Sequence, residues 1–268
     1  MPPGEVGPVN ATSLEGRVYL VTGAAGGIGE GIAGALVEAG GMVALVDIDL
    51  DGARSTARRV GLADTSSAAF RADVSDADEV EAAVESTVQH FGRIDGAVNN
   101  AGVVTLDEAW EATGPDWNHQ LEINVTGSFL VAQAVGKRLK ASGGGSIVNV
   151  ASNCGKVGYR NMAAYNASKS AVLGLTRSLS MEWAEHGINV NAVCPGGVDT
   201  PMLAGVAEWL SPRLDIPAEE LLGSMGPAQL GRRITPMEVG RVIAFLLSDA
   251  AHIIRGQAIN VDGGDTWY

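Results

Sequence analysis

Short apolar runs alternate along this chain with longer segments whose apolar residues recur every three or four positions. The run Val18 to Val21 breaks at once into glycine. The stripe that follows consists of Ile28, Ile32, Ala35, Leu36 and Ala39. A short apolar run bounded by turn residues predicts a buried strand, and the three-to-four spacing predicts a helix. After a polar segment, the chain therefore begins with a strand, a glycine turn and a helix.

The same alternation continues to the C-terminus and predicts an α/β fold with a parallel sheet. Apolar runs predict strands at 18–21, 42–46, 68–72, 94–98, 146–151, 188–193 and 258–261. Helices are predicted at 28–39, 53–60, 80–91, 117–139, 165–183 and 239–247. Because no repeat or linker interrupts this pattern, we expect one domain over 16–268, preceded by a loose polar arm at 1–15.

The glycine turn has the composition of a dinucleotide site. A strand, a glycine turn and a helix together aim free backbone N–H groups and a helix N-terminus at a phosphate. Gly23, Gly27 and Gly29 allow a tight turn, a close approach to the pyrophosphate and close packing of helix on strand. An ordinary tight turn is the alternative in a chain with 36 glycines. The strand and helix on either side favour the dinucleotide site.

An acidic residue follows the second predicted strand at the position expected for a ribose contact. Asp47 lies at the end of that strand, close to the ~20 residues expected between the glycine turn and such a carboxylate. A carboxylate there accepts hydrogen bonds from the ribose hydroxyls of NAD and repels the 2′-phosphate of NADP. Nearby Gly26 and Ile48 supply no basic side chain for that phosphate. A helix cap is the alternative role for Asp47, and the sequence favours NAD as cofactor.

A second group of polar residues has the spacing of a proton-transfer site. Ser152 ends the fifth predicted strand, and Tyr165 and Lys169 lie one turn apart at the start of the next helix. An ammonium close to a phenol favours the phenolate and lowers its pKa from ~10 toward working pH. Such a phenol can act as a general base or acid. A surface pair on a helix is the alternative, which the preceding serine and dinucleotide turn disfavour.

Amides at two further positions also indicate a site. The segment 99–102, Asn-Asn-Ala-Gly, follows the fourth strand, and small residues there let the backbone pass close to a ligand. Asn124 lies inside the predicted helix 117–139, where a buried amide needs hydrogen-bond partners. It either bonds backbone groups or holds a catalytic water.

Taken together, these motifs resemble the short-chain dehydrogenase/reductase family. They are Thr22-Gly-x-x-x-Gly-x-Gly29, Asn99-Asn-Ala-Gly102, Asn124, Ser152, Tyr165 with Lys169, and Pro195-Gly196 with Thr200. They occur in the family's order and spacing over roughly residues 16–264. The resemblance implies a Rossmann-type, doubly wound, seven-stranded parallel sheet of order 3-2-1-4-5-6-7, and a homotetramer. In such a sheet the ligand lies at the carboxyl ends of the strands.

The resemblance also implies hydride transfer between NAD and a secondary alcohol or ketone. Tyr165 would take the hydroxyl proton, Ser152 would bind the same oxygen, and Lys169 would lower the tyrosine pKa and bind the nicotinamide ribose. Asn124 would hold a water that relays the proton. The implied cofactor residues are Gly23, Gly27, Ile28, Gly29, Asp47, Ile48, Asp73, Val74, Asn100, Ala101, Gly102, Tyr165, Lys169, Pro195, Gly196, Val198 and Thr200.

Substrate contacts are less well defined by the sequence. The resemblance places Ser152, Asn153, Cys154, Tyr159, Tyr165 and Trp209 around the substrate. Residues 201–233 are the least family-like, and their apolar, proline-interrupted pattern predicts a mobile substrate lid. An amide at Asn153 can bond a second hydroxyl beside the reacting carbon, which favours a vicinal diol or small polyol. Alternatively, Asn153 faces away and bonds backbone.

Composition narrows the possible partners. A chain of 268 residues with 46% hydrophobic and 18% charged residues is typical of a globular α/β domain. A net charge of −13 argues against nucleic acid and anionic membranes. No apolar run reaches the ~18 residues of a membrane span, and residues 1–10 do not resemble a signal peptide. Two cysteines and four scattered histidines indicate a cytoplasmic protein without a metal site.

Three alternative functions stay open. A 3-oxoacyl reductase acting on a carrier protein should prefer NADPH, which Asp47 disfavours. It must also dock an acidic carrier, which the negative net charge of this chain disfavours. The basic residues Lys137, Arg138 and Lys140 keep it open. A hydroxysteroid or cyclic-ketone reductase would also suit an apolar lid. A protein that senses NAD without chemistry would not need the serine, tyrosine and lysine together.

Overall fold

The described residues form one sheet of seven parallel strands. The computed structural model describes residues 11–61 and 66–268. The strands are β1 (Val18–Thr22), β2 (Met42–Asp47), β3 (Ser67–Arg71), β4 (Gly96–Asn99), β5 (Gly145–Val150), β6 (Ile188–Pro195) and β7 (Ala258–Val261). Their order in the sheet is β3-β2-β1-β4-β5-β6-β7. The predicted fold class and strand order are therefore confirmed.

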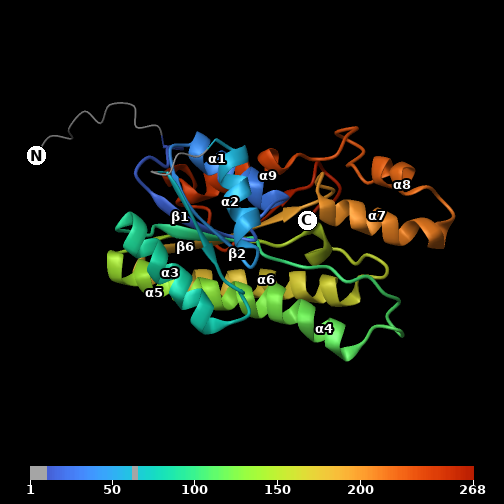
Figure 1. Cartoon of the computed structure of the whole chain (residues 1–268), viewed down its shortest axis with the longest axis horizontal. Helices are drawn as coiled ribbons and strands as arrows, with labels where there is room; N and C mark the ends of the chain where they lie inside the picture. Colours follow the sequence, from blue (N-terminus) through green and yellow to red (C-terminus); the bar gives the residue numbers. More distant parts are fainter. Residues whose placement is uncertain (1–10, 62–65) are drawn as a thin grey trace, which may run out of the picture.

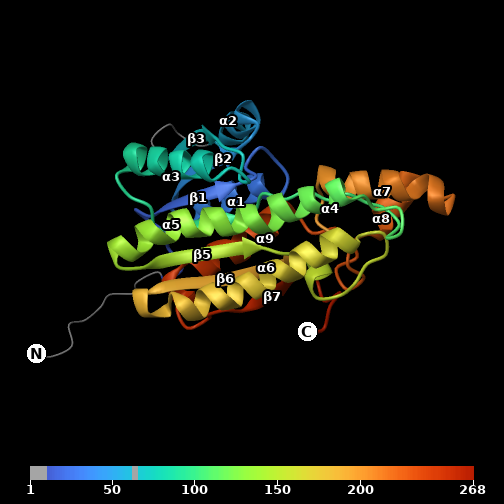
Figure 2. The same ribbon diagram turned by 90° about the horizontal axis from the view of Figure 1, so that it is seen from below.

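Helices cover both faces of the sheet (Figures 1 and 2). One face carries α1 (Ile28–Glu38), α2 (Leu50–Arg59) and α9 (Pro236–Leu247). The opposite face carries α3 (Ala77–Phe91), α5 (Ser128–Ser142) and α6 (Ala163–Glu182). Three further helices, α4 (Gly114–Leu121), α7 (Pro201–Leu214) and α8 (Ala218–Ser224), lie beyond the carboxyl ends of the strands.

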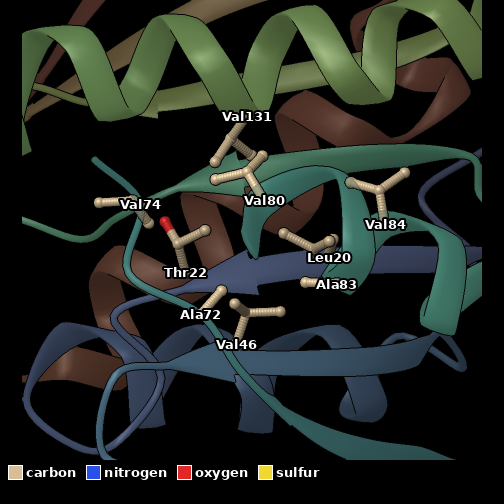
Figure 3. A pocket seen from close by; sticks show the side chains of 9 residues that line it. All are labelled: Leu20, Thr22, Val46, Ala72, Val74, Val80, Ala83, Val84 and Val131. Carbon is tan, nitrogen blue, oxygen red and sulfur yellow. The ribbon is translucent and has the colours of Figure 1, made fainter. Parts of the chain in front are cut away.

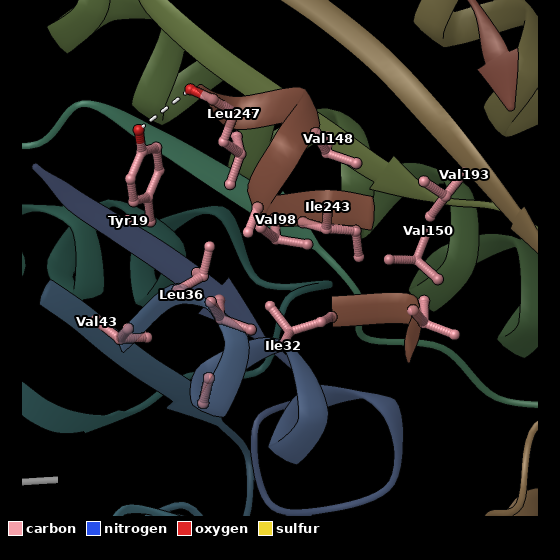
Figure 4. Close-up of a cluster of buried hydrophobic side chains, with 14 of the residues drawn as sticks. Tyr19, Ile32, Leu36, Val43, Val98, Val148, Val150, Val193, Ile243 and Leu247 are labelled. Atoms are coloured by element: carbon pink, nitrogen blue, oxygen red, sulfur yellow. Dashed lines mark hydrogen bonds between the residues drawn. The ribbon is translucent and has the colours of Figure 1, made fainter. Parts of the chain in front are cut away.

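Each face of the sheet has its own apolar core. Under α1 and α9, buried aliphatic side chains from five strands pack with Ile32 and Ile243, and the Tyr19 hydroxyl donates a 3.3 Å bond to the Leu247 carbonyl (Figure 4). On the other face, α3 and α5 pack over β1 and β2 (Figure 3). The side chains that meet there are Leu20, Thr22, Val46, Ala72, Val74, Val80, Ala83, Val84 and Val131. Strands buried on both faces explain the continuous apolar runs in the sequence.

The N-terminal segment is attached to this core before the first strand. Of the arm expected at 1–15, residues 1–10 lie outside the described residues. Leu14 is fully buried, and its backbone N–H donates a 2.8 Å bond to the Ala39 carbonyl at the end of α1. The last residues of the expected arm are therefore packed on the core.

Helices α1 and α9 cross in close contact, because glycines remove the side chains between them. A Cβ on Gly240 would lie 2.3 Å from the Gly31 carbonyl oxygen, and a Cβ on Gly31 would lie 2.1 Å from the Pro236 carbonyl carbon. Real Cβ atoms essentially never approach so closely. Backbone contact at this crossing places α1, and with it the glycine turn, against the sheet.

We predict that Gly240→Ala destabilises the protein by about 1–3 kcal/mol, the usual cost of overpacking a core. The matched control is Gly205→Ala in α7, where a new Cβ meets nothing within 4 Å. Because glycine costs about 0.5–1 kcal/mol relative to alanine inside a helix, the control should not destabilise. Urea denaturation measures both free energies of unfolding, and equal stability of the two variants would contradict the close crossing.

Candidate active site

The glycine turn is shaped by backbone contacts that exclude side chains. Gly23 and Gly27 have positive φ angles, +63° and +56°. A Cβ on Gly29 would lie 2.1 Å from the Gly23 carbonyl oxygen, and a Cβ on Gly23 would lie 2.8 Å from the Cα of Ala101. Because α1 begins at Ile28, its first N–H groups face the turn without helical partners. This cradle fits a dinucleotide phosphate.

The segment Asn99 to Gly102, which begins at the end of β4, is hydrogen-bonded directly to this turn. The Asn100 side-chain amide donates 3.0 Å bonds to the carbonyls of Thr22 and Gly23. The Thr22 hydroxyl accepts bonds from the backbone N–H groups of Asn100 and Ala101. The two segments therefore form one unit at the carboxyl ends of β1 and β4.

Asp47 ends β2 beside the glycine turn. Its carboxylate accepts 2.9 Å bonds from the backbone N–H groups of Ala25 and Asp49. The cap of α2 is Asp49, whose side chain accepts a bond from Gly52. The cap role considered for Asp47 is therefore wrong. Ile48 is 58% exposed and places no charge beside it.

The other expected cofactor residues lie at the same edge of the sheet. Asp73 follows β3 and accepts bonds from Ser75, which hold its pKa below the ordinary value. Val74 is buried against Gly127. The turn from Pro195 through Gly196 to Val198 follows β6, and Thr200 then caps α7. A Cβ on Gly27 would lie 3.6 Å from the Thr200 methyl group, so this turn faces the glycine loop.

The structure also brings the serine, tyrosine and lysine together. Ser152 follows β5 and lies near enough to Tyr165 to lower the pKa of its phenol. The Lys169 ammonium lies 5.6 Å from the centre of the Tyr165 ring and donates a 2.8 Å bond to the Val150 carbonyl. Gly102 passes beside Lys169, because a Cβ there would lie 3.4 Å from Nζ. The group therefore lies next to the dinucleotide turn.

Burial dominates the titration of this group. It raises the pKa of Tyr165 well above its ordinary value, against the lowering effect of the Ser152 hydrogen bond. It lowers the pKa of Lys169 to about 8. We expected Lys169 to lower the tyrosine pKa, whereas burial raises it. The Lys169 ammonium donates to the Val150 carbonyl, and desolvation is the largest cause of the raised pKa of the phenol.

Asn124 lies in a π-helical turn, Glu122–Gly127, that joins α4 to α5. The sequence predicted one uninterrupted helix over 117–139. The side-chain oxygen of Asn124 accepts a 2.8 Å bond from the Val103 N–H, and its amide nitrogen donates to the Val103 carbonyl and the Ser168 hydroxyl. Of the two roles considered, the structure therefore shows the amide bonded within the protein. The Asn124 backbone carbonyl accepts a bond from the Ser128 hydroxyl, and its second lone pair could hold a water.

Sequence reasoning missed Ser168 as part of this arrangement. Its hydroxyl accepts from Asn124 and donates a 2.8 Å bond to the Tyr165 carbonyl, so it connects the π-helical turn with α6. It is fully buried. The available signal was the need of a buried asparagine for partners, together with a polar residue one turn from Tyr165.

The expected substrate residues separate into two groups. Asn153, Cys154 and Tyr159 follow Ser152 directly, and the Asn153 amide donates a 3.0 Å bond to the Tyr159 hydroxyl. Burial raises the pKa of the Cys154 thiol. Trp209 lies on α7 with its ring under the Arg213 guanidinium, 3.5 Å from the ring centre. Among the described contacts, none joins Trp209 to Ser152 or Tyr165.

Comparisons with known proteins agree with this geometry. A family model described as enoyl-(acyl carrier protein) reductase matches residues 23–266. D-threitol dehydrogenase of Mycolicibacterium smegmatis is 42% identical over 253 residues, which are 94% of each chain. NAD-dependent glycerol dehydrogenase of Listeria innocua is 36% identical over 95% of each chain. A crystal structure of 3-ketoacyl-(acyl-carrier-protein) reductase from Brucella melitensis with NADH is 34% identical at a TM-score of 0.82, covering 94% of this chain and 99% of that one.

The part of the chain that the structure describes contains neither a cluster of metal ligands nor a membrane-spanning helix. No cluster of three or more histidine, cysteine, aspartate or glutamate side chains could hold a metal ion there. No helix within 11–61 and 66–268 is long and apolar enough to cross a membrane.

The buried lysine predicts a pH-dependent stability difference. Because the Lys169 pKa is about 8 in the folded protein and ordinarily 10.5, the unfolded state binds more protons in this window. The cost of burying the charged Lys169 ammonium is fully present below pH 8 and is relieved as the pH rises toward 10.5. The stability of Lys169→Met should therefore fall relative to wild type between pH 8 and 10, by up to about 1.4 kcal/mol per pH unit.

Urea denaturation at half-unit pH steps measures this difference. The control is Lys140→Met, which removes an exposed lysine of α5 and should give a constant difference over the same range. A constant difference for Lys169→Met as well would show that the buried ammonium carries no such penalty.

Proposed function

The chain belongs to the short-chain dehydrogenase/reductase family, and from that premise we propose that it transfers hydride between NAD and a secondary alcohol, with a small polyol or vicinal diol favoured. The observation that carries the proposal is the grouping of Ser152, Tyr165 and Lys169 beside the glycine turn. Relatives named for threitol and glycerol, both polyols, support the substrate class.

The residues present fit a nicotinamide dinucleotide. The positive-φ glycines and the unpartnered N–H groups of α1 suit the pyrophosphate, and Asp47 suits the adenosine ribose. Asp73 and Val74 would contact the adenine, and Val198 and Thr200 the carboxamide. When bound, the nicotinamide supplies the hydride acceptor or donor. The relatives named as NAD-dependent or solved with NADH support NAD over NADP.

Tyr165 would transfer the proton. In reduction, its phenol donates a proton to the carbonyl oxygen, and the raised pKa keeps that proton in place until the substrate arrives. In oxidation, the phenolate takes the proton from the alcohol. Ser152 would bind the same substrate oxygen. Its hydroxyl oxygen accepts a 3.1 Å bond from the Cys154 N–H, which helps to orient it.

Lys169 and Asn124 would support this transfer. With a pKa of about 8, Lys169 can take or release a proton near working pH, which suits one end of a relay. Gly102 lies between the Lys169 ammonium and the side-chain oxygen of Asn124. A Cβ on this glycine would lie within 3.4 Å of both groups. A water at the Asn124 backbone carbonyl would complete the route to solvent.

A carrier-bound 3-oxoacyl reductase is the second candidate. The description of the family model and the Brucella melitensis relative favour it. That relative was solved with NADH, so use of NAD does not exclude a carrier substrate. The net charge of −13 opposes docking of an acidic carrier, and Arg138 is already paired with Glu81 and Glu85. A homotetramer, a cytoplasmic location and a lid at 201–233 also belong to the proposal and rest on the family resemblance.

Cofactor choice gives the first test. Asp47→Ser should lower the preference for NAD over NADP by about tenfold or more, because it removes a charge that repels the 2′-phosphate; tenfold corresponds to about 1.4 kcal/mol. Serine can still accept the Ala25 bond. The control is Asp51→Ser, which removes the same charge from a side chain that is 91% exposed. The measurement is kcat/KM with each cofactor, and an unchanged ratio in Asp47→Ser would remove Asp47 from the ribose site.

The proton-transfer role gives the second test. Tyr165→Phe should lower kcat by about 10²–10⁴-fold, the usual contribution of a positioned acid or base. NADH affinity, measured by fluorescence titration, should change little because the ring is retained. Absorbance at 340 nm follows turnover on 2,3-butanediol. Retention of more than a tenth of wild-type kcat would rule out Tyr165 as the proton donor.

A further inference from the structure

The Asn153 side chain bridges two hydroxyl groups. Its oxygen accepts a 3.3 Å bond from the Ser152 hydroxyl, and its amide nitrogen donates a 3.0 Å bond to the Tyr159 hydroxyl. Only 7% of Asn153 is exposed. These bonds use one donor and one acceptor site of the amide. Both are made to side chains, so the bond to backbone considered from the sequence is not among them.

Tyr159 is the outermost group of this bridge. Its backbone carbonyl accepts a 2.9 Å bond from the side chain of Asn166, the residue after Tyr165. Its hydroxyl accepts from Asn153, so the loop and the phenol are both anchored. The residue remains 42% exposed. Among the described residues nothing accepts the Tyr159 hydroxyl proton, which is thus available to a ligand.

The surroundings keep this phenol protonated. Partial burial raises the pKa of Tyr159, and Cys154, Asp265 and Asp262 act in the same direction. The Asn153 bond acts against them, with the smallest effect. A neutral phenol that already accepts one bond is a hydrogen-bond donor toward an uncharged oxygen.

We propose that Tyr159 determines specificity by donating a hydrogen bond to a second hydroxyl of the substrate, and that Asn153 is the positioning residue that fixes it relative to Ser152. The proposal rests on the proposed function, because Ser152 must hold the reacting oxygen. The two hydroxyls are connected through the single amide group of Asn153. A substrate that meets both of them carries two oxygens close together, which favours a vicinal diol or the corresponding hydroxyketone.

The test compares a matched pair of alcohols, 2,3-butanediol and 2-butanol, with NAD. Wild type should show a kcat/KM ratio of diol to mono-alcohol of about tenfold or more, because the mono-alcohol lacks the second hydroxyl that would accept the Tyr159 hydrogen bond. Tyr159→Phe keeps the ring and removes the donor, and should lower this ratio by about tenfold. Asn153→Ala should lower it similarly, and the double variant should lower it no further.

The matched control is Tyr268→Phe, which removes a phenol that donates to the Lys156 carbonyl on the outer side of the same loop. Its ratio should equal that of wild type. Thermal unfolding of each variant separates specificity from folding, since a purely structural Tyr159 would lower the melting temperature and both activities together without moving the ratio. That result overturns the proposal.

The remaining outcomes distinguish this proposal from the proposed function. If wild type oxidises both alcohols but without a diol preference, or if Tyr159→Phe retains the preference, the proposed function stands and the role of Tyr159 fails. If wild type oxidises neither alcohol with NAD or NADP, while binding NADH in a fluorescence titration, the proposed substrate class itself fails.

Discussion

Close backbone packing where β1 and β4 end is the constraint on which the site depends. The space beside Gly23 admits no Cβ, because Ala101 lies there, and the Asn100 amide bonds both carbonyls of the turn. This contact fixes the direction in which α1 leaves the sheet. It also fixes Gly102 beside Lys169. The dinucleotide cradle and the proton-transfer group therefore share one edge, although more than a hundred residues separate them in sequence.

Burial determines the protonation of the two titrating groups at that edge of the sheet. It disfavours the charged form of both Tyr165 and Lys169. The phenol of Tyr165 is held neutral, and the ammonium of Lys169 is made easier to deprotonate. The phenol and the ammonium have both lost hydration without forming an ion pair with each other. The folded protein is therefore less stable than it would be with two apolar side chains in their place. Such a cost is expected at functional sites, where perturbed pKa values are useful for proton transfer. The same desolvation makes the site responsive to any charge brought by a bound cofactor.

The sequence predicted the sheet and its order but not every local detail. Strand positions followed from apolar runs, because parallel strands are buried on both faces and leave a clear pattern. The π-helical turn at Asn124 leaves no such pattern, and the partner of its side chain, Val103, lies in another loop. Similarly, sequence spacing placed Tyr165 beside Lys169, but the direction of the pKa shifts depends on burial and on the Val150 carbonyl. Local pattern predicts elements, whereas tertiary contacts decide protonation.

The substrate pocket shows why the reaction was easier to predict than its substrate. The loop after Ser152 contacts residues that are remote in sequence, among them the C-terminal Tyr268. Gln229 donates to the Gly264 carbonyl, and Tyr268 donates to the Lys156 carbonyl, so the C-terminal residues touch both the lid segment and the loop. A Cβ on Gly263 would lie 2.6 Å from Pro227. Because these contacts join segments that are far apart in sequence, the local pattern that predicts the catalytic motifs does not predict them.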